Sequence, residues 1–485
     1  MIKKNILIYV NDGFAIRYLL RSDIYKNLIS SNCNIIIVSH NSDEEYFKKK
    51  FSAHNVTLES CRVQEYERYR SKNKLQRILR IFRSFILNGN YDTQTVDDFR
   101  EIYVYQQGWI IKNGYLKYSI GLLWQALSKV FMKFKFLRSM LLKFEYIFYT
   151  PKIHSDLFQK YEPDLVVVTA LCGFEYNEFF AREALKNKCK ICTIILSWDN
   201  TSGIGYPGYV PNFVVSWTNQ MKKELIELND VDPKKIFVGG IAHFDHYFNS
   251  DVISKNELFS QLNLDLNKKT IFYATKSPRR FPWGPDIVKF IAESIKTKKI
   301  YSNAQLLVRI HPLHYRKSKN KDFSDILKKY DDIENEYENV IINRPKISSR
   351  KINFDMEDDE MSITAAILTH SDLMINMFST MIIEASIFNL PSINICLKNE
   401  FRGNEIKTKQ DIMVEHRQTH SKRVYETGGV RNIYTYDQFI ECINEFLNDK
   451  KIDAEKRLKI VDNEVGEFRG NSGDNISRIL INLAN

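Results

Sequence analysis

The sequence has no apolar run long enough to cross a bilayer. Its 485 residues are 44% apolar, yet they include no stretch of about eighteen consecutive apolar residues, roughly the length that a spanning helix needs. The apolar run at residues 5–10 is too short for a signal peptide, and no small-residue cleavage site follows it. We therefore expect a cytoplasmic protein, with peripheral binding to the inner face of the membrane as the remaining alternative.

Cysteine is sparse and irregularly spaced. The seven cysteines form no repeated ligand spacing, and their number is odd, which argues against a disulfide framework and a zinc ribbon. The CxxC pair, Cys189 and Cys192, comes at the start of an expected strand rather than a helix, which is the wrong context for a redox motif. We expect reduced, mostly buried thiols.

Motifs for nucleic-acid binding are also missing. The sequence contains no helix-turn-helix, zinc-finger or RNA-stacking pattern, so the surplus of basic residues does not indicate nucleic acid. The net charge is nevertheless +11, with 70 Lys plus Arg against 59 Asp plus Glu. This charge favours an anionic partner, such as a nucleotide, a phosphorylated substrate or an anionic lipid.

Short apolar runs alternate with helical patterns in two series, which predicts two domains built on parallel sheets. The length of the chain also favours two hydrophobic cores. We place the first domain at residues 1–248, the second at 249–455 and a tail helix that crosses back to the first domain at 456–485. The expected strands are at 6–10, 34–38, 164–169, 190–196, 212–217 and 235–240, then at 270–275, 305–310, 340–343, 373–376 and 391–396.

Residues 66–149 break this rhythm. They are helical in pattern and rich in aromatic residues, and lysine and arginine are interleaved with leucine, isoleucine and phenylalanine. Two interpretations remain open. The segment is either an insertion packed on the first domain or an amphipathic surface that lies on a membrane.

Polar residues follow the expected strands of the second domain. Arg309, His311 and Pro312 end one strand, and a histidine there can donate a hydrogen bond or a proton to a leaving phosphate. Ser379 and Thr380 follow another strand and start a helix, whose amino terminus favours anions. The simpler alternatives are a capped strand end and an ordinary N-cap.

Three further residues of the second domain are candidates for donor binding. Glu384, in the helix after Thr380, is a candidate ligand for ribose hydroxyls, or else an ordinary first-turn acid. Lys276 and Arg279 follow the strand at 270–275, and their charge can neutralise the phosphates of a leaving nucleotide.

The first domain supplies candidates for a base and for acceptor binding. Asp12 and Gly13 end the first strand, and glycine permits close approach of a ligand to the backbone. Later strand ends carry Trp198, Asp199 and Asn200, and then His243. Trp198 can stack on a sugar and Asp199 can accept a hydroxyl proton, although an Asx turn also explains Asp199 and Asn200.

The His-Pro pair at 311–312 and the Ser-Thr pair at 379–380, with Glu384 in the following helix, resemble the donor domain of GT-B glycosyltransferases. The pairs are similar to motifs of bacterial CMP-sugar-using sialyltransferases and of CDP-glycerol glycerophosphotransferases; UDP-N-acetylglucosamine 2-epimerases share the superfamily pattern. The segments around Trp198 and His243 resemble glycosyltransferases of bacterial surface polysaccharides, such as capsule and O-antigen. Residues 11–13 resemble an acidic-acidic-glycine sialyltransferase motif, with asparagine in place of the first acid.

The resemblance implies an α/β protein of GT-B type, with two facing, doubly wound, Rossmann-like domains and a cleft between them. It also implies an inverting glycosyltransferase that transfers a sugar from a nucleotide-sugar donor to a glycan or lipid-linked glycan. The first domain would bind the acceptor, with Asp12 or Asp199 as base, and the second would bind the donor. A CMP-sugar is favoured and a UDP-sugar comes next. CDP-glycerol transfer and UDP-sugar 2-epimerisation remain alternatives.

We expect neither a cofactor nor a metal. No clean Asp-x-Asp site of the kind found in metal-dependent glycosyltransferases stands out, and Asp358 and Asp359 are adjacent, as in a solvated acidic turn.

Overall fold

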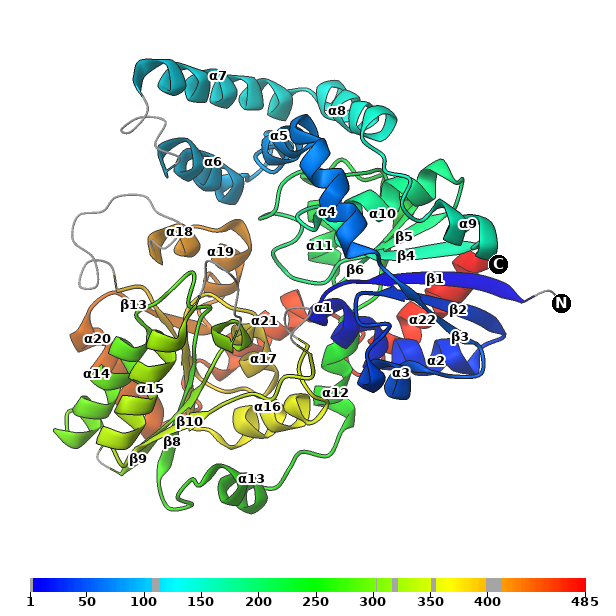
Figure 1. Cartoon of the computed structure of the whole chain (residues 1–485). Helices are drawn as coiled ribbons and strands as arrows, with labels where there is room; N and C mark the ends of the chain where they lie inside the picture. The colour runs from blue at the N-terminus through cyan, green and yellow to red at the C-terminus, as the bar shows by residue number, and fades with distance from the viewer. Residues whose placement is uncertain (1–2, 107–113, 302, 316–321, 350–354, 398–411) are drawn as a thin grey trace. The chain divides into compact units, whose positions relative to one another are not determined.

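Two separate parallel sheets organise the chain. The computed structural model describes residues 3–106, 114–301, 303–315, 322–349, 355–397 and 412–485 (Figure 1). One unit comprises residues 1–245 and 466–485, and the other comprises residues 246–465. The tail at 456–485, expected as one helix, forms two. Of these, α21 (Ala454–Glu464) belongs to the second unit, and α22 (Ser472–Ala484) belongs to the first.

The sheet of the first unit has seven parallel strands in the order β3-β2-β1-β4-β5-β6-β7. Its strands grow outward in both directions from β1 and β4, so the topological switch point, where such sheets bind ligands, lies at the carboxyl ends of these two strands. The bounds are β1 Lys4–Val10, β2 Cys33–Ser39, β3 Val56–Ser60, β4 Leu165–Thr169, β5 Ile191–Ile194, β6 Phe213–Ser216 and β7 Ile236–Val238.

Helices connect these strands, and α22 returns to pack on α2. The Asn27 amide donates to Asp474 over 2.6 Å, and both carboxylate oxygens of Asp245 accept backbone N–H groups, from Ser472 and Gly473, at the start of α22. The connecting elements are α1 Gly13–Ala15, η1 Ile16–Leu20, α2 Asp23–Ser30, α3 Glu45–Phe51, α9 Ser155–Tyr161, α10 Glu175–Lys186, α11 Asn219–Glu227 and η2 Pro233–Lys235. After β7 come η3 Ala242–Phe244 and then α12 Asp245–Asn249, most of which belongs to the second unit.

The helical insertion predicted at 66–149 lies between β3 and β4. It consists of α4 Val63–Lys72, α5 Lys74–Arg83, α6 Gln94–Gln106, α7 Gly114–Lys133 and α8 Lys135–Phe148. Its inner side packs as a small core that includes Phe82, Met132, Leu141 and Tyr206.

A buried ion network joins this insertion to the sheet's own helices. Arg83 of α5 pairs with Glu145 of α8 and with Glu178 of α10, and Arg182 of α10 pairs with Glu145 over 2.6 Å. None of the four side chains is more than 1% exposed. Two guanidinium groups therefore balance two carboxylates in the interior of the unit.

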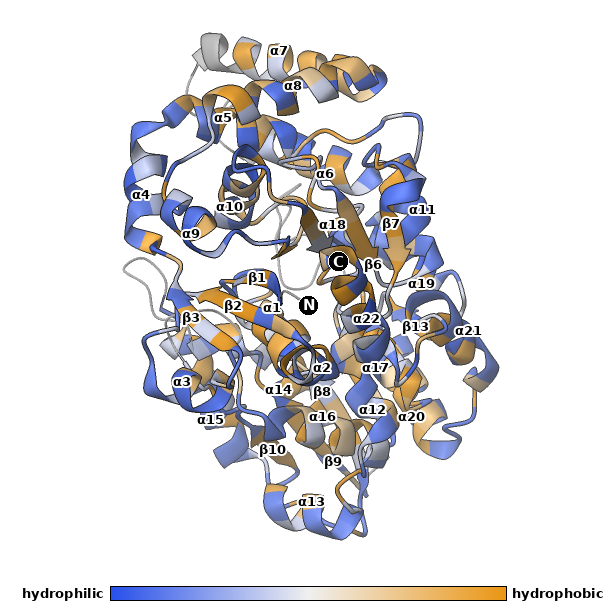
Figure 2. Cartoon of the chain, turned by 90° about the vertical axis from the view of Figure 1, so that its right-hand side faces the viewer, coloured by the Kyte–Doolittle hydropathy of each residue, from blue (hydrophilic) through white to orange (hydrophobic). Residues whose placement is uncertain are grey.

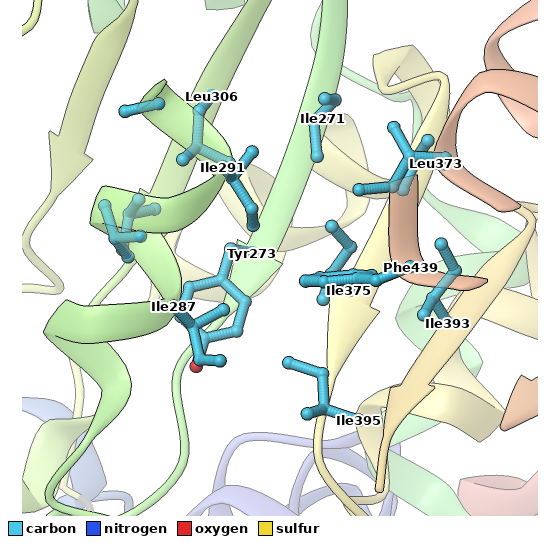
Figure 3. Packing of buried hydrophobic residues seen from close by; sticks show 14 of the residues in the cluster. Ile271, Tyr273, Ile287, Ile291, Leu306, Leu373, Ile375, Ile393, Ile395 and Phe439 are labelled. Atoms are coloured by element: carbon cyan, nitrogen blue, oxygen red, sulfur yellow. The ribbon is translucent and has the colours of Figure 1, made fainter. Parts of the chain in front are cut away.

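The second unit has six parallel strands in the order β10-β9-β8-β11-β12-β13, so its switch point lies at β8 and β11. Apolar residues of β8, β9, β11 and β12 pack with Ile287 and Ile291 of α14 and Phe439 of α20 (Figure 3). The strand bounds are β8 Lys269–Ala274, β9 Ala304–Arg309, β10 Val340–Asn343, β11 Leu373–Asn376, β12 Ser392–Ile395 and β13 Val430–Ile433.

Helices flank this second sheet as well. They are α13 Lys255–Leu262, α14 Gly284–Lys296, η4 Pro312–Tyr315, α15 Ser324–Glu336, α16 Asp359–His370, α17 Met381–Ile387, α18 Ile412–His416, α19 Thr419–Tyr425 and α20 Tyr436–Asn448, in addition to α21. The prediction of an α/β protein with two doubly wound parallel sheets is thus confirmed. Within the described residues, no helix combines the length and the apolar character needed to cross a membrane.

The ion network predicts that an isosteric substitution at one of its carboxylates strongly destabilises the fold. Glu145→Gln removes the carboxylate shared by Arg83 and Arg182 and leaves excess positive charge in the interior, so we expect the free energy of unfolding to fall by about 3–5 kcal/mol in urea titrations. Glu441→Gln, on the exposed side of α20, is the matched control and should change it by less than about 0.5 kcal/mol. Equal effects of the two substitutions would contradict the prediction.

Candidate functional site

The carboxyl ends of β8, β9 and β11 bring several predicted residues to one edge of the second sheet. β8 pairs with both β9 and β11. Thr275 follows β8, and its hydroxyl accepts the backbone N–H of His311 over 2.8 Å, while its own N–H donates to the carbonyl of Arg309. The residues after β8, β9 and β11 therefore share the edge where open parallel sheets bind ligands.

Lys276 ties the loop after β8 to the loop after β11. Its ammonium donates to the carbonyls of Met377 (3.3 Å) and Phe378 (2.9 Å) and pairs with Glu415. The side chains of Lys276 and Glu415 are only 13% and 10% exposed. Lys276 thus holds the loop that precedes Ser379, and its charge is balanced by a carboxylate.

The same loop has a strained backbone at Phe378, where φ is +32°, a value unusual for a residue with a side chain. Its N–H donates to the side-chain oxygen of Asn394 over 2.9 Å. Together, Asn394 and Lys276 hold the loop in this conformation from two sides. Strain of this kind concentrates at ligand-binding segments.

His311 is held as a neutral imidazole. Its Nδ1 accepts the backbone N–H of Leu313 over 3.1 Å, which places the ring proton on Nε2. Burial, reinforced by the nearby His314 and by the positive charge of Lys276, lowers the pKa of His311 to about 3. In this structure His311 is therefore a hydrogen-bond donor at neutral pH rather than a charged acid.

Arg309 is engaged within the unit. Its guanidinium donates to the side chain of Asn343 on β10 and pairs with Glu360 of α16. The other oxygen of Glu360 accepts the backbone N–H of Lys346 over 2.8 Å. Arg309 therefore joins β9, β10 and α16, while the backbone beyond it leads to His311 and Pro312, the first residue of η4.

Ser379 and Thr380 directly precede α17, as predicted, but only the serine hydroxyl accepts a capping hydrogen bond. The hydroxyl of Ser379 accepts the N–H of Met381 over 3.0 Å, whereas the side chain of Thr380 makes no capping bond. Glu384, one turn into the helix, is buried and accepts a hydrogen bond from the hydroxyl of Tyr247.

Arg279 is exposed on the loop after Lys276. The neighbouring Arg280 lies 3.8 Å from Glu415, which also pairs with Lys276. The two basic residues singled out in this segment thus have different surroundings, with Lys276 mostly buried and Arg279 exposed.

Sequence analysis missed Asn376, the last residue of β11. Its side chain is fully buried, and neither its amide nitrogen nor its oxygen has a hydrogen-bond partner within the described residues. Buried polar atoms without partners are rare and call for an explanation, such as a ligand or water. The available signal was an asparagine at the end of an otherwise apolar strand, directly before the Ser-Thr loop.

Asp12 lies at the switch point of the first sheet. Its Oδ1 accepts the N–H of Ala15 over 2.8 Å at the start of α1, whose first residue is Gly13, while Oδ2 is buried without a partner in the described chain. Burial raises the pKa of Asp12 to about 6, against the opposing effect of the backbone hydrogen bonds. A carboxyl with this pKa can accept a proton near neutral pH.

His243 is buried in η3, beside the segment that follows Asp12. Its ring lies 5.2 Å from that of Tyr18 in η1, and the Tyr18 hydroxyl donates to the carbonyl of Gly240 over 2.7 Å. Burial, with a smaller effect from the charge of Arg17, lowers the pKa of His243 well below its usual value. His243 is therefore neutral and supports the packing of η1 against η3.

Trp198, Asp199 and Asn200 form a tight turn after β5. Trp198 and Asn200 are buried, and the Asn200 amide donates to the carboxylate of Asp199 over 3.2 Å. The backbone carbonyl of Asp199 accepts the N–H of Gly203 over 2.8 Å. The turn thus uses Asp199 and Asn200 internally, while the Asp199 side chain remains half-buried.

The described residues contain no cluster of histidine, cysteine, aspartate or glutamate that could hold a metal ion. The sequence does contain one Asp-x-Asp triplet, at residues 230–232, which we did not consider as a metal site. Asp230 pairs with Arg138 and accepts the Tyr206 hydroxyl, and Asp232 accepts the N–H of Lys234 at the start of η2. Both carboxylates therefore serve the fold.

Solved structures with this fold cover nearly the whole chain. S. aureus MnaA, solved with UDP, matches with a TM-score of 0.53 at 12% identity, covering 99% of this chain and 97% of MnaA. The UDP-GlcNAc 2-epimerase from Neisseria meningitidis, bound to UDP-GlcNAc, matches with a TM-score of 0.52 at 12% identity, covering 99% and 100%. No protein-family model and no curated protein sequence matches the chain. At 12% sequence identity this likeness shows the fold alone. It confirms the predicted GT-B fold class, an α/β protein with two parallel sheets.

The contacts of Lys276 predict that it stabilises the loop before Ser379, which an exposed lysine would not do. Lys276→Met leaves two carbonyls without this donor and removes the shorter of the two ion contacts of the Glu415 carboxylate, so we expect the free energy of unfolding to fall by about 2–4 kcal/mol. Lys269→Met breaks the more exposed pair with Asp372 and should cost less than about 1 kcal/mol. Urea denaturation distinguishes the two, and similar losses would show that the Lys276 contacts do not hold the loop.

The raised pKa of Asp12 predicts a pH-dependent cost to stability. Because the folded chain retains this proton up to a higher pH than the unfolded chain, the contribution of Asp12 is most favourable below about pH 4 and is lost as pH rises through about 6. We expect Asp12→Asn to be more stable than the wild type by about 2–3 kcal/mol at pH 8 and by no more than about 0.5 kcal/mol at pH 4. Urea titrations at both pH values measure this, and an unchanged difference between them would contradict it.

Proposed function

We propose that the chain is an inverting, metal-independent glycosyltransferase that transfers a sugar from a pyrimidine-nucleotide donor to a glycan or lipid-linked glycan of the cell surface. The observation that carries this proposal is Asp12, a buried carboxyl at a sheet switch point. One of its oxygens has no hydrogen-bond partner among the described residues, and its pKa is raised to about 6. A base of this kind suits deprotonation of a hydroxyl near neutral pH.

In this reaction Asp12 takes the proton of the acceptor hydroxyl. The acceptor oxygen forms a bond to the anomeric carbon, the bond from that carbon to the donor phosphate breaks, and its electron pair leaves on the phosphate oxygen. At the β8–β11 edge, we assign contacts with the departing nucleotide to the His311 ring and to the Ser379–Thr380 segment. Arg279 supplies positive charge, and Lys276 serves donor binding by holding the loop before Ser379.

The remaining predicted residues take supporting roles in the proposal. Arg309 positions the chain that leads to His311 through its contacts with Asn343 and Glu360. Glu384, held by Tyr247, is the candidate for the ribose hydroxyls. Asp199 is the alternative base, and Trp198, Asn200 and His243 shape the region assigned to the acceptor.

Both CMP-sugars and UDP-sugars are donor candidates. The His-Pro and Ser-Thr pairs favour CMP, whereas two proteins of similar fold were solved with UDP and with UDP-GlcNAc. The second of these is named a 2-epimerase, which keeps epimerisation of a UDP-sugar as the second candidate function. The extra helices at 63–148 have no evident use in that reaction. CDP-glycerol transfer is the third candidate.

A donor panel separates these reactions. The purified chain is incubated with CMP-, UDP-, GDP- and CDP-activated donors and with acceptor glycans, and products are analysed by mass spectrometry. Sugar transfer to the acceptor with nucleotide release supports the proposal. Isomerised UDP-sugar carrying solvent deuterium identifies an epimerase, and CMP release with phosphate in the product identifies glycerol-phosphate transfer. The proposal fails if no donor is consumed and no nucleotide shifts the melting temperature.

Asp12→Asn and Asp199→Asn test the choice of base. We expect Asp12→Asn to lower kcat by about a hundredfold or more while nucleotide binding is unchanged, and Asp199→Asn to retain most activity. For the wild type, kcat/KM should rise with pH and level off above about 6, as Asp12 loses its proton. The reverse ranking of the two variants would assign the base to Asp199.

A further inference from the structure

The helices α7 and α8 carry apolar side chains on both of their sides. Their inner sides pack into the small core of the insertion, through Met132, Leu141 and Leu142. Their outer sides are exposed to solvent and are nevertheless apolar. About half of the exposed large hydrophobic side chains among the described residues belong to residues 120–148. Figure 2 shows hydrophobic residues along both helices. A large exposed apolar surface of this kind usually marks an interaction site.

Most of the exposed apolar residues of α7 form one stripe. Ile120, Leu123, Leu127 and Val130 follow each other at intervals of three or four residues, so they lie on one side of the helix, and Phe134 comes directly after its end. Leu122, which is also exposed, lies off this stripe. Leu123 is 68% exposed. This spacing indicates an organised surface rather than scattered apolar residues.

A second stripe continues on α8. Phe136, Met140, Phe144 and Phe148 repeat every four residues and are all exposed. The ring of Phe136 lies 5.9 Å from that of Phe134, so the two stripes meet where α7 ends and α8 begins. We call the exposed apolar residues of both helices the outer face.

The exposed charges of α7 and α8 have one sign. Lys129, Lys133, Lys135 and Lys143 are exposed beside the apolar residues. The only acid between residues 119 and 148 is Glu145, which is fully buried and pairs with Arg83 and Arg182. The exposed part of α7 and α8 therefore combines apolar side chains with lysines and presents no carboxylate.

We propose that the outer face of α7 and α8 docks on an anionic lipid bilayer, with its apolar stripes in the headgroup region and its lysines on lipid phosphates. Apolar residues flanked by lysine are typical of helices that lie in the membrane interface. A second copy of the chain fits less well, because a symmetric contact would bring lysines against lysines. Since no described helix can span the bilayer, the contact is peripheral.

Sedimentation with vesicles tests this with the full chain, first for the apolar stripes. Wild type should sediment with vesicles of equimolar phosphatidylcholine and phosphatidylglycerol. The variant Leu123→Gln/Leu127→Gln/Met140→Gln should bind them at least about tenfold more weakly, because it withdraws apolar side chains from the interface. Leu266→Gln/Leu458→Gln, which changes exposed leucines elsewhere, should bind like wild type. Circular dichroism and melting temperatures verify that the variants fold.

The lysines are tested separately. Lys129→Gln/Lys133→Gln/Lys143→Gln should weaken binding to the anionic vesicles by about tenfold or more, and added salt should weaken wild-type binding. Lys450→Gln/Lys451→Gln/Lys459→Gln, which changes three exposed lysines of the second unit, is the matched control. Wild type should bind pure phosphatidylcholine vesicles less tightly than the anionic ones.

Three results would overturn the proposal: wild type that does not sediment, a stripe variant that binds as well as wild type, or a vesicle-free dimer that the stripe variant abolishes. The last result would assign the outer face to a second copy of the chain. These measurements need no nucleotide, so their failure leaves the proposed transferase reaction intact, and failure of the donor panel leaves membrane binding intact.

Discussion

The buried network of Arg83, Glu145, Glu178 and Arg182 is the constraint on which the first unit depends. Charges removed from water are tolerated only when each has a partner, so α5, α8 and α10 must assemble together. Glu178 also accepts the N–H of Gly173 on the loop after β4, and Arg182 donates to the carbonyl of Gly208. The same charges that anchor the helical insertion thus also fix loops at the carboxyl edge of the sheet.

The packing around this network also explains why residues 205 and 208 are glycines. A side-chain carbon at Gly208 would lie 2.5 Å from the carboxylate of Glu178, and one at Gly205 would lie 2.4 Å from the backbone of Ser84. Gly205 also has a φ of +96°, which residues with side chains rarely adopt. The close approach of this loop to α5 and α10 is therefore specified by glycine as well as by charge.

The sequence predicts the central strands well because their apolar runs are continuous, as in β1, β8 and β11. It missed β3 and β13, which lie at sheet edges and carry polar residues such as Glu59 and Arg431. Side-chain partners are harder still. Arg309 was predicted to serve donor binding, and the structure adds an ion pair with Glu360 that joins residues 51 positions apart. No local pattern indicates such a contact.

The same limit applies to α7 and α8. Alternation of lysine with apolar residues indicates amphipathic helices, but it does not tell which side of each helix is buried. In the structure, Glu145 and Arg138 face inward to ion partners, whereas Phe136 and Met140 face outward. Two charged residues of α8 are thus in the interior, and its outer side is left to apolar residues and lysines. Because buried partners hold these charges in place, the apolar exposure follows from the packing of the insertion, and burial of the outer face requires a surface beyond the unit itself.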